Sequence, residues 1–314
     1  MLKFFDSYIR SSKSLYGAVF YVSEFSEAII QNSEITGSLT AGTIFDISTS
    51  IFTILDSKIS NNLNNMFLLT QSKLILLRTA VLNHSCFSKI QGCIIFAQLE
   101  SNITIVSLKV NNVTSITDDL ILVISSHASF NELIFELISS EKEVGSCIGS
   151  VDSIIYLKDS NFKYYLGNCL NFKNSNIFSE ALSLSYNLPN MSVKNNGAFF
   201  CINCDILFII NSTFENNKNV NNGAGIYLAR QFKSEPKNLT YSLIQNSIFV
   251  ENEVFKKGGA IFIENEHLII ESSIFKGNKG IRGGGIFNFI EGNLLKSFPN
   301  LFIFWVLFRV VFLY

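Results

Sequence analysis

Three copies of one short sequence, between residues 211 and 289, decide the fold of this chain. The first copy reads Asn211-Ser-Thr-Phe-Glu-Asn-Asn217 and closes on Gly223-Ala-Gly-Ile-Tyr-Leu228. The second reads Asn246-Ser-Ile-Phe-Val-Glu-Asn252 and closes on Gly258-Gly-Ala-Ile-Phe-Ile263. The third reads Ser272-Ser-Ile-Phe-Lys-Gly-Asn278 and closes on Gly283-Gly-Gly-Ile-Phe-Asn288. Repetition at a fixed period indicates a stack of similar structural units.

Weaker copies of the closing motif extend almost to the N-terminus at intervals of about 25 residues. The anchors are Gly17, Gly42, Asn65, Gly92, Asp119, Ser146, Asn168, Gly197, Ala224, Gly259 and Gly284. One longer interval contains a polar insertion at residues 230–238, which we interpret as a loop. The spacing predicts a single solenoid of about eleven coils over residues 1–292, with the best-preserved repeats at 205–289.

Each repeat contains short runs of Val, Ile and Phe that are separated by Asn, Ser, Asp or Gly. Such runs are typical of β-strands, and helical periodicity is hard to find. A leucine-rich repeat is the main alternative at this period, but its fixed Leu and Asn frame is absent. We therefore predict an all-β, parallel β-helix.

Asn and Gly at the ends of these runs suggest sharp corners, because both residues tolerate left-handed backbone angles. The predicted corner residues are Asn217, Asn252, Asn278, Gly223, Gly258, Gly259, Gly283 and Gly284. The glycine runs do not form a phosphate-binding loop, since no Gly-Lys-Ser/Thr motif or helix start follows them.

The pairing of Phe-x-x-Asn with Gly-Gly-Ala-Ile over residues 211–289 resembles the polymorphic outer-membrane protein repeat. That resemblance implies a right-handed parallel β-helix of the pectin-lyase-like type. It also implies display, adhesion or scaffold roles at the cell surface or outside the cell, without catalysis. Residues 17–200 match the rhythm of the repeat but lack the paired signature.

The composition excludes a role in binding nucleic acid. The formal net charge is −1, only 16% of residues are charged, and no block of Lys or Arg is present. Residues 1–10 lack the apolar core of a secretory signal and resemble repeat sequence, so we expect the array to continue upstream of Met1.

The C-terminal segment, residues 298–314, differs from the repeats. Residues 301–314 are apolar except for Arg309 and are shorter than the ~20 residues of a full membrane span. Three interpretations remain open: a truncated span that associates with a membrane, a buried terminal strand pair, or misread non-coding sequence.

Candidate catalytic residues are few. Asp118 and Asp119 form the only aspartate doublet, with His127 nearby in sequence. A polysaccharide lyase or hydrolase on a β-helix is the alternative function, and it requires carboxylates gathered in one external groove. The doublet matches no motif of such enzymes, so we interpret it as a solvated turn and expect no catalytic residue.

The cysteines predict no metal site or cofactor. Cys201-Ile-Asn-Cys204 has the spacing of half a zinc site, but no second pair follows, which leaves a local disulfide or plain packing. Cys93, Cys147 and Cys169 each follow an anchor and are expected to stack in one column of small residues, with Cys147 beside Cys169.

Six Asn-x-Ser/Thr sequons begin at Asn83, Asn102, Asn112, Asn190, Asn211 and Asn238. Asn238, in the polar insertion, and Asn211 are the candidates for glycosylation. The overall expectation is a non-catalytic rod whose partner is a surface protein or a carbohydrate, with residues 230–238 as one contact point.

Overall fold

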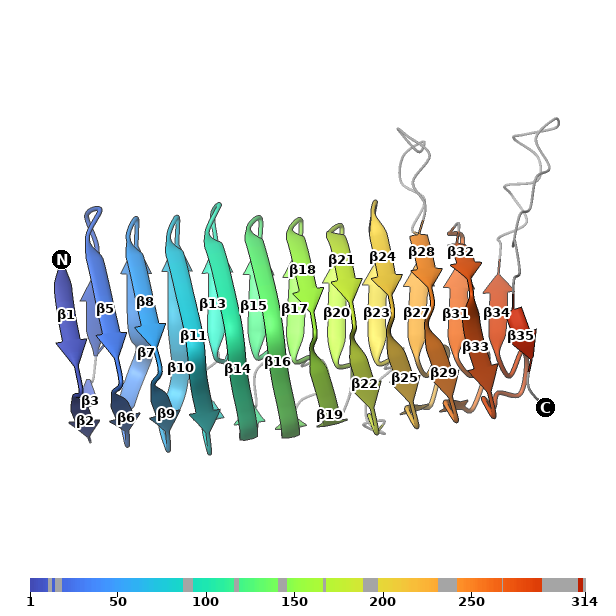
Figure 1. Ribbon diagram of the computed structural model, residues 1–314, viewed down its shortest axis with the longest axis horizontal. Coiled ribbons are helices and arrows are strands. Elements are labelled where there is room, and N and C mark those ends of the chain that lie inside the picture. Colours follow the sequence, from blue (N-terminus) through green and yellow to red (C-terminus); the bar gives the residue numbers. More distant parts are fainter. Residues whose placement is uncertain are drawn as a thin grey trace.

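A computed structural model describes residues 1–10, 13–14, 19–86, 93–115, 119–140, 146–165, 168–188, 197–230, 242–266, 268–289 and 310–312. Every regular element in these ranges is a β-strand, and the strands stack side by side along an elongated body (Figure 1). The strands pair in parallel across successive coils, so the fold is the predicted all-β parallel β-helix.

Three parallel ladders form the walls of the solenoid. The first ladder contains β1 (Leu2–Phe5), β5 (Glu27–Gln31), β8 (Ile51–Leu55), β11 (Lys73–Leu82), β14 (Asn102–Ser115), β16 (His127–Ser140), β18 (Ile154–Lys158), β21 (Asn176–Glu180), β24 (Leu207–Ile210), β28 (Ser242–Gln245) and β32 (Leu268–Glu271). The second contains β2 (Tyr8–Arg10), β6 (Glu34–Thr36), β9 (Lys58–Ser60), the C-terminal parts of β11, β14 and β16, then β19 (Asn161–Tyr165), β22 (Ser183–Ser185), β25 (Thr213–Glu215), β29 (Ile248–Val250), β33 (Ser273–Lys276) and β35 (Val310–Phe312).

The third ladder contains β4 (Phe20–Val22), β7 (Leu39–Ser48), β10 (Leu63–Thr70), β13 (Ile95–Gln98), β15 (Ile121–Ile124), β17 (Ile148–Val151), β20 (Leu170–Lys173), β23 (Phe199–Ile202), β27 (Ile226–Ala229), β31 (Ile261–Glu264) and β34 (Ile286–Phe289). Four short strands remain: β3 (Lys13–Ser14), β12 (Ser85–Cys86), β26 (Lys218–Asn219) and β30 (Glu253–Val254). The first and third ladders each hold eleven described strands, close to the expected number of coils.

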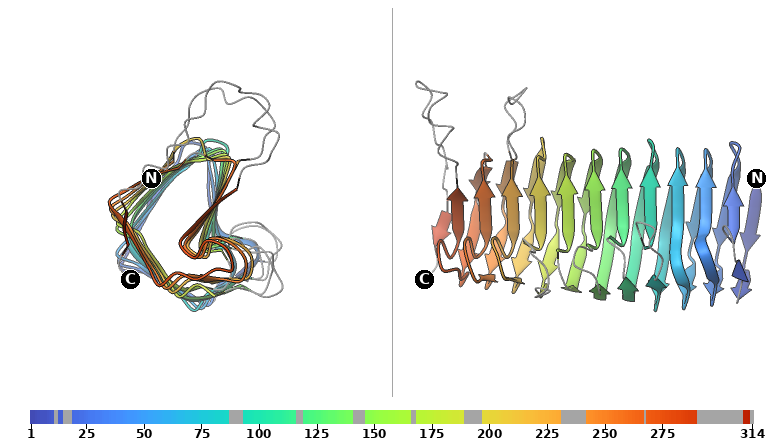
Figure 2. Two further views of the ribbon diagram at one scale, coloured as in Figure 1. Left: turned by 90° about the vertical axis from the view of Figure 1, so that its right-hand side faces the viewer. Right: turned by 180° about the vertical axis from the view of Figure 1, so that it is seen from behind.

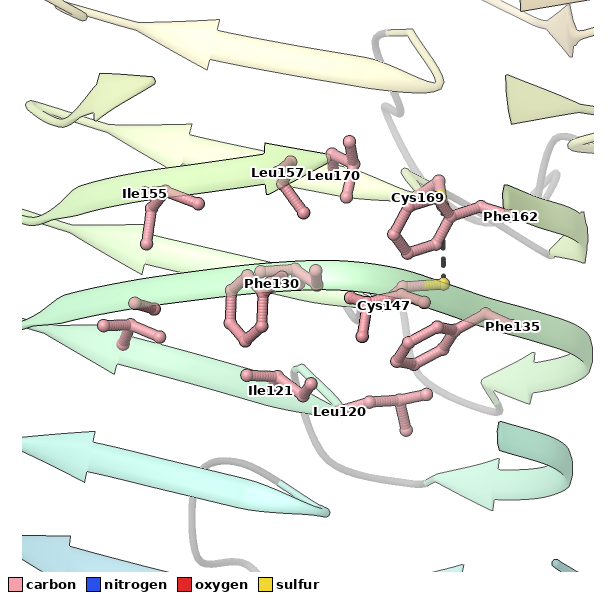
Figure 3. Packing of buried hydrophobic residues seen from close by; sticks show 14 of the residues in the cluster. Leu120, Ile121, Phe130, Phe135, Cys147, Ile155, Leu157, Phe162, Cys169 and Leu170 are labelled. Carbon is pink, nitrogen blue, oxygen red and sulfur yellow. Dashed lines mark hydrogen bonds between the residues drawn. The ribbon is translucent and has the colours of Figure 1, made fainter. Parts of the chain in front are cut away.

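The core fills the inside of the stacked coils, whose outlines superpose when viewed down the long axis (Figure 2). Alternate side chains of each strand point inward, as in β5 and β8, because successive residues of a strand face opposite sides. Like residues stack on like residues from coil to coil: the rings of Phe214, Phe249 and Phe275 lie 4.8 and 4.7 Å apart. Figure 3 shows this packing in the central coils, with Phe135 beside Phe162 and Cys147 beside Cys169.

Two of the three corners are built by serine. At the first corner, between the first and second ladders, Asp56 has a left-handed backbone (φ 49°) and Ser57 follows it. The Ser57 Oγ accepts a hydrogen bond from the N–H of Ser33 one coil away (3.1 Å) and donates one to the Leu55 carbonyl (2.6 Å). The third corner, between the third and first ladders, repeats this arrangement, as in the bond from Ser126 N to Ser153 Oγ (3.2 Å). Asp/Asn-Ser is therefore the sequence of a corner: one residue turns the chain and the next satisfies the backbone.

Asparagine builds the second corner, which follows the second ladder, in the C-terminal coils. The side-chain amides form a ladder: Asn187 Nδ2 donates to Asn217 Oδ1 (2.7 Å), Asn217 Nδ2 to Asn252 Oδ1 (2.9 Å), and Asn252 Nδ2 to Asn278 Oδ1 (2.9 Å). The prediction that Asn217, Asn252 and Asn278 themselves adopt left-handed angles is wrong. The left-handed residues are their predecessors Asn216, Glu251 and Gly277, with φ of 53°, 52° and 63°.

The corner glycines act in two ways. Gly223, Gly258 and Gly283 have φ of 61°, 67° and 60°, and a Cβ atom on each would lie within 2.4 Å of a backbone oxygen. Gly259 and Gly284 adopt no such angle; a Cβ on Gly259 would lie 2.1 Å from the Gly284 carbonyl oxygen of the next coil. Gly259 therefore permits close stacking on the next coil, whereas a Cβ on Gly284 would meet the Asn278 carbonyl of its own coil (2.8 Å); neither glycine turns the chain.

The register of the anchors matches the prediction from Asp119 to Gly284 and differs by one residue nearer the N-terminus. Asn65 pairs with Thr43, and the Cys93 N–H bonds the Asp119 carbonyl, so Thr43 and Cys93 fill the positions assigned to Gly42 and Gly92. Cys93 therefore does not share a column with Cys147 and Cys169. These two are adjacent, as predicted, with their Sγ atoms 3.4 Å apart.

Most of residues 298–314 lies outside the described residues. Val310–Phe312 forms β35, which pairs in parallel with β33. The described residues include no α-helix with the length and hydrophobicity of a membrane span.

Candidate functional site

A shallow groove of about 650 Å³ lies at the first corner of the N-terminal coils. Each coil contributes a corner residue, an inward-facing residue and the first residue of the second ladder. The lining residues are Asp6, Ser7, Tyr8, Asn32, Ser33, Glu34, Asp56, Ser57, Lys58 and Arg78. Because parallel coils place equivalent residues in register, side chains far apart in sequence come together in one surface feature.

Three carboxylates and two cations face this groove. Lys58 Nζ lies 3.0 Å from Glu34 Oε1. Arg78 donates two hydrogen bonds to the Asp56 carboxylate, one from Nε to Oδ1 and one from Nη2 to Oδ2 (2.8 Å). These hydrogen bonds hold the pKa of the Asp56 carboxyl below its usual range.

Asp6 and Tyr8 complete the groove. Asp6 lies at the corner with φ of 46°, its side chain is exposed, and no ion pair among the described residues includes it. Tyr8 is 59% exposed. The groove thus offers hydrogen-bond acceptors, charged donors and one flat apolar surface to a ligand.

A second cluster of charges surrounds Arg230, next to the polar insertion. Arg230 Nε donates to Glu266 Oε2 (2.9 Å), its Nη1 lies 3.4 Å from Asp205 Oδ1, and its Nη2 bonds the Cys204 carbonyl (3.2 Å). The Glu266 side chain is only 4% exposed, so this pair is largely closed to solvent. We interpret it as a structural clamp where Glu266 replaces a corner serine.

An aromatic column covers the outer face of the third ladder beside this clamp. The rings of Phe200, Tyr227, Phe262 and Phe287 stack at intervals of 5.1, 5.1 and 5.8 Å. The Tyr227 hydroxyl donates to Glu264 Oε2 (2.6 Å), and burial, together with this bond, raises the pKa of the tyrosine. Tyr227 and Phe262 are buried, so this column is a small second core rather than an open binding face.

The aspartate doublet and His127 do not form a site. Asp119 is buried and accepts hydrogen bonds from the N–H and hydroxyl groups of Ser146, so its interpretation as a solvated turn is wrong. Gly149 makes room for the carboxylate, because a Cβ there would lie 2.2 Å from Asp119 Oδ2. His127 is exposed at the start of β16 in another ladder, and Asp118 lies outside the described residues.

The cysteines form two disulfides and one free pair. Cys201 and Cys204 are bonded to each other, which selects the local disulfide among the alternatives open from the sequence. Cys147 and Cys169 are free and buried, and burial raises the pKa of the Cys147 thiol, an effect that the neighbouring Cys169 thiol increases. The second disulfide, Cys86–Cys93, was not expected from the sequence.

Among the sequons, Asn211 is exposed at a corner with φ of 52°, an accessible position for modification. Asn238 and Asn190 lie outside the described residues, as does most of the polar insertion at residues 230–238. The groove itself was missed from the sequence. Its signal is the recurrence of an acidic or amide residue before Ser in three successive coils: Asp6, Asn32 and Asp56.

No protein-family profile matches the chain, so the resemblance to the polymorphic outer-membrane repeat gains no support from that comparison. No curated protein matches it either. Among solved structures, the chain is similar to the catalytic domain of a GH87 α-1,3-glucanase in complex with nigerose, with 9% identity and a TM-score of 0.23, covering 84% of this chain and 52% of the other. It is also similar to the Dettilon tailspike protein, with 10% identity and a TM-score of 0.23, covering 91% of this chain and 62% of the other.

The chain spans less than two thirds of either matched structure, and likeness at this level transfers neither an activity nor a ligand. The prediction that the chain has no enzymatic activity is nevertheless corrected. The enzyme alternative requires carboxylates gathered in one external groove, and Asp6, Glu34 and Asp56 line such a groove.

Proposed function

We propose that this chain is a β-helical scaffold that binds a polysaccharide in the groove of its N-terminal coils. The observation that carries the proposal is the composition of this groove: three carboxylates, two cations and the exposed ring of Tyr8 on the rim of consecutive coils. Carboxylate and guanidinium groups hydrogen-bond hydroxyls, and a flat aromatic ring packs on the apolar face of a sugar.

The charge of the groove selects the class of polysaccharide. Asp6, Glu34 and Asp56 contribute three negative charges and Lys58 and Arg78 two positive ones, so the net charge is 2 − 3 = −1. A polyanion would meet no excess of positive charge here. The groove therefore favours a neutral polysaccharide over a uronic-acid or sulfated one.

Binding to a panel of neutral, acidic and amino polysaccharides tests the proposal, by affinity electrophoresis and then calorimetry with the best oligosaccharide. Tyr8→Ala should weaken binding at least tenfold, equivalent to about 1.4 kcal/mol. Tyr156→Ala is the matched control, because Tyr156 is 48% exposed on β18, away from the groove. Equal loss in both variants, or unchanged binding by Tyr8→Ala, would refute the proposal.

The same groove supports a second candidate function, cleavage of the bound polysaccharide. Glycoside hydrolysis requires a pair of carboxyl groups, and Asp6 is the one groove carboxylate outside the two ion pairs. Release of reducing ends from the bound polysaccharide, abolished in Asp6→Asn, would support catalysis. Binding without release of reducing ends would restrict the function to recognition.

The location is also a proposal: the cell surface or the extracellular space, with membrane association through residues 301–314. It rests on the resemblance of residues 211–289 to a surface-protein repeat and on the exposed sequon at Asn211. Expression in a secreting eukaryotic host should give glycan on Asn211, detected by a mass shift that peptide-N-glycosidase removes and Asn211→Gln abolishes. An unmodified Asn211 in secreted protein would count against this location.

A further inference from the structure

The interior of the second corner holds a histidine that the fold does not explain. His84 occupies the inward position that Asn62 fills one coil before, and its side chain is completely buried. Neither ring nitrogen of His84 has a partner in good hydrogen-bond geometry, although the Asn64 backbone lies close to the ring. Buried polar atoms without partners are rare and expensive, because they lose their bonds to water and gain none in return.

Two cysteines lie beside this ring. Cys86, two residues further on in β12, and Cys93, which lies two residues before β13, are both completely buried. A ring nitrogen of His84 and the two Sγ atoms all lie within 4.8 Å of one another. The Cys86 Sγ also lies 3.6 Å from the backbone carbonyl oxygen of Asn64.

In the structure described here the two sulfur atoms form a disulfide. Reduction by a thiol reductant supplies two electrons and two protons, which convert the disulfide to two thiols while the reductant leaves as its own disulfide. The site then contains one imidazole and two thiol groups. We propose that the reduced form of this site, His84, Cys86 and Cys93, binds Zn²⁺, so that the pair switches between a disulfide and a metal centre.

The donor set and its charge fit zinc. Zn²⁺ accepts one histidine nitrogen and two thiolates in tetrahedral sites, and the ion displaces one proton from each thiol. Two thiolates neutralise the ion, so a buried complex carries no net charge, which a low-dielectric interior requires. The fourth position of the ion would be filled by a water molecule or by the Asn64 carbonyl oxygen, which lies 3.6 Å from Cys86 Sγ.

The geometry requires only a local adjustment. Zinc–sulfur bonds of about 2.3 Å hold two thiolates about 3.8 Å apart in a tetrahedral site. The two sulfur atoms must therefore move apart once the disulfide bond is broken. Zinc binding would break no well-formed hydrogen bond of the His84 ring.

The test uses the full chain, reduced with a water-soluble phosphine, which leaves as phosphine oxide, and then desalted without oxygen. One equivalent of Zn²⁺ should remain bound per chain after a second desalting, whereas the oxidised chain should retain none. Co²⁺ should replace Zn²⁺ and give the intense visible bands of tetrahedral coordination together with thiolate-to-cobalt charge transfer.

Variants assign the site. His84→Gln should weaken Zn²⁺ binding by at least about 100-fold, because it removes a direct ligand and loss of an outer-shell partner alone costs about 10–100-fold. Cys86→Ala with Cys93→Ala should abolish it. Cys201→Ala with Cys204→Ala, which removes the other disulfide pair, is the matched control and should leave it unchanged.

Two outcomes would overturn the proposal: no zinc retained by the reduced wild-type chain, or equal retention by the Cys86→Ala/Cys93→Ala chain. If the variants fail to fold, as judged by loss of the β-sheet signal in circular dichroism, the cobalt spectrum of the wild-type chain decides alone. Absence of charge-transfer bands there would refute thiolate ligation.

Discussion

Replacement of Asn252 by alanine should remove the central rung of the asparagine ladder and destabilise the C-terminal coils. The Asn252 side chain makes four hydrogen bonds. Its Oδ1 accepts from the N–H (3.2 Å) and Nδ2 (2.9 Å) of Asn217, and its Nδ2 donates to the Phe214 carbonyl (2.9 Å) and to Asn278 Oδ1 (2.9 Å). At about 1 kcal/mol for each, the expected loss is about 4 kcal/mol, because the partners left behind are buried in Asn217 and Phe214 and half-buried in Asn278.

Urea unfolding followed by circular dichroism measures this loss. Coils of a solenoid contact only their neighbours, so hydrogen exchange of the amides of β29 and β33 should show where the stability is lost. Gln245→Ala is the matched control: its amide makes one exposed bond to Glu271, so the change should cost less than about 0.5 kcal/mol. A loss below about 1 kcal/mol for Asn252→Ala would refute the role assigned to the ladder.

Three further predictions concern a core phenylalanine, a corner glycine and the buried histidine His84. Phe249→Ala should cost about 3–5 kcal/mol in urea unfolding, because its ring is completely buried between two others; a loss below about 2 kcal/mol would contradict this. Gly258→Ala should cost more than Gly277→Ala, since a Cβ at Gly258 meets a backbone oxygen at 2.3 Å whereas one at Gly277 meets only a side chain at 3.3 Å; equal costs would contradict the reasoning. Burial lowers the pKa of His84 to about 4, an effect that the nearby Asn64 backbone opposes in part, so the folded chain holds this ring neutral while the unfolded chain protonates it near pH 6.5. Relative to a His84→Asn chain, the wild type should therefore have its full stability above pH 6.5 and lose up to about 3 kcal/mol as the pH falls to 4, and parallel pH profiles would refute this.

The fold could be predicted from the sequence because each of the strongest repeats contains both a core residue and a corner residue of its coil. In Phe-x-x-Asn the Phe enters the core stack and the Asn enters the amide ladder, so the spacing of the motif is the spacing of two inward positions around a left-handed residue. The role of Asn was assigned wrongly because Asn suits both the left-handed position and the inward position next to it. Only the hydrogen bonds between coils show which of these two positions the Asn occupies.

The register failed near the N-terminus for a related reason. Gly42 and Gly92 look like the glycines of the later repeats, yet Thr43 and Cys93 pair with the neighbouring coils. β7 and β10 are long strands of 10 and 8 residues, so no corner glycine is needed to mark where the strand begins. Glycine marked the register correctly from Gly197 onward, where a positive φ (Gly197) or close backbone contact (Gly259) excludes a larger residue.

The groove and the buried His84 cluster could not be predicted by inspection of the sequence. The groove brings together residues that lie more than 20 positions apart, and the His84 cluster joins Cys86 in β12 to Cys93 before β13. A shift of one residue in register would place them on different faces. The same error of one residue assigned Cys93 to the wrong column and hid its pairing with Cys86.

The most direct test of the account is the position of a bound oligosaccharide. A crystal structure of the chain with a neutral oligosaccharide selected from the binding panel should place the sugar in the N-terminal groove, against the Tyr8 ring and within hydrogen-bond distance of Asp6 or Arg78. A sugar bound elsewhere on the rod, with the groove empty, would contradict the proposed function.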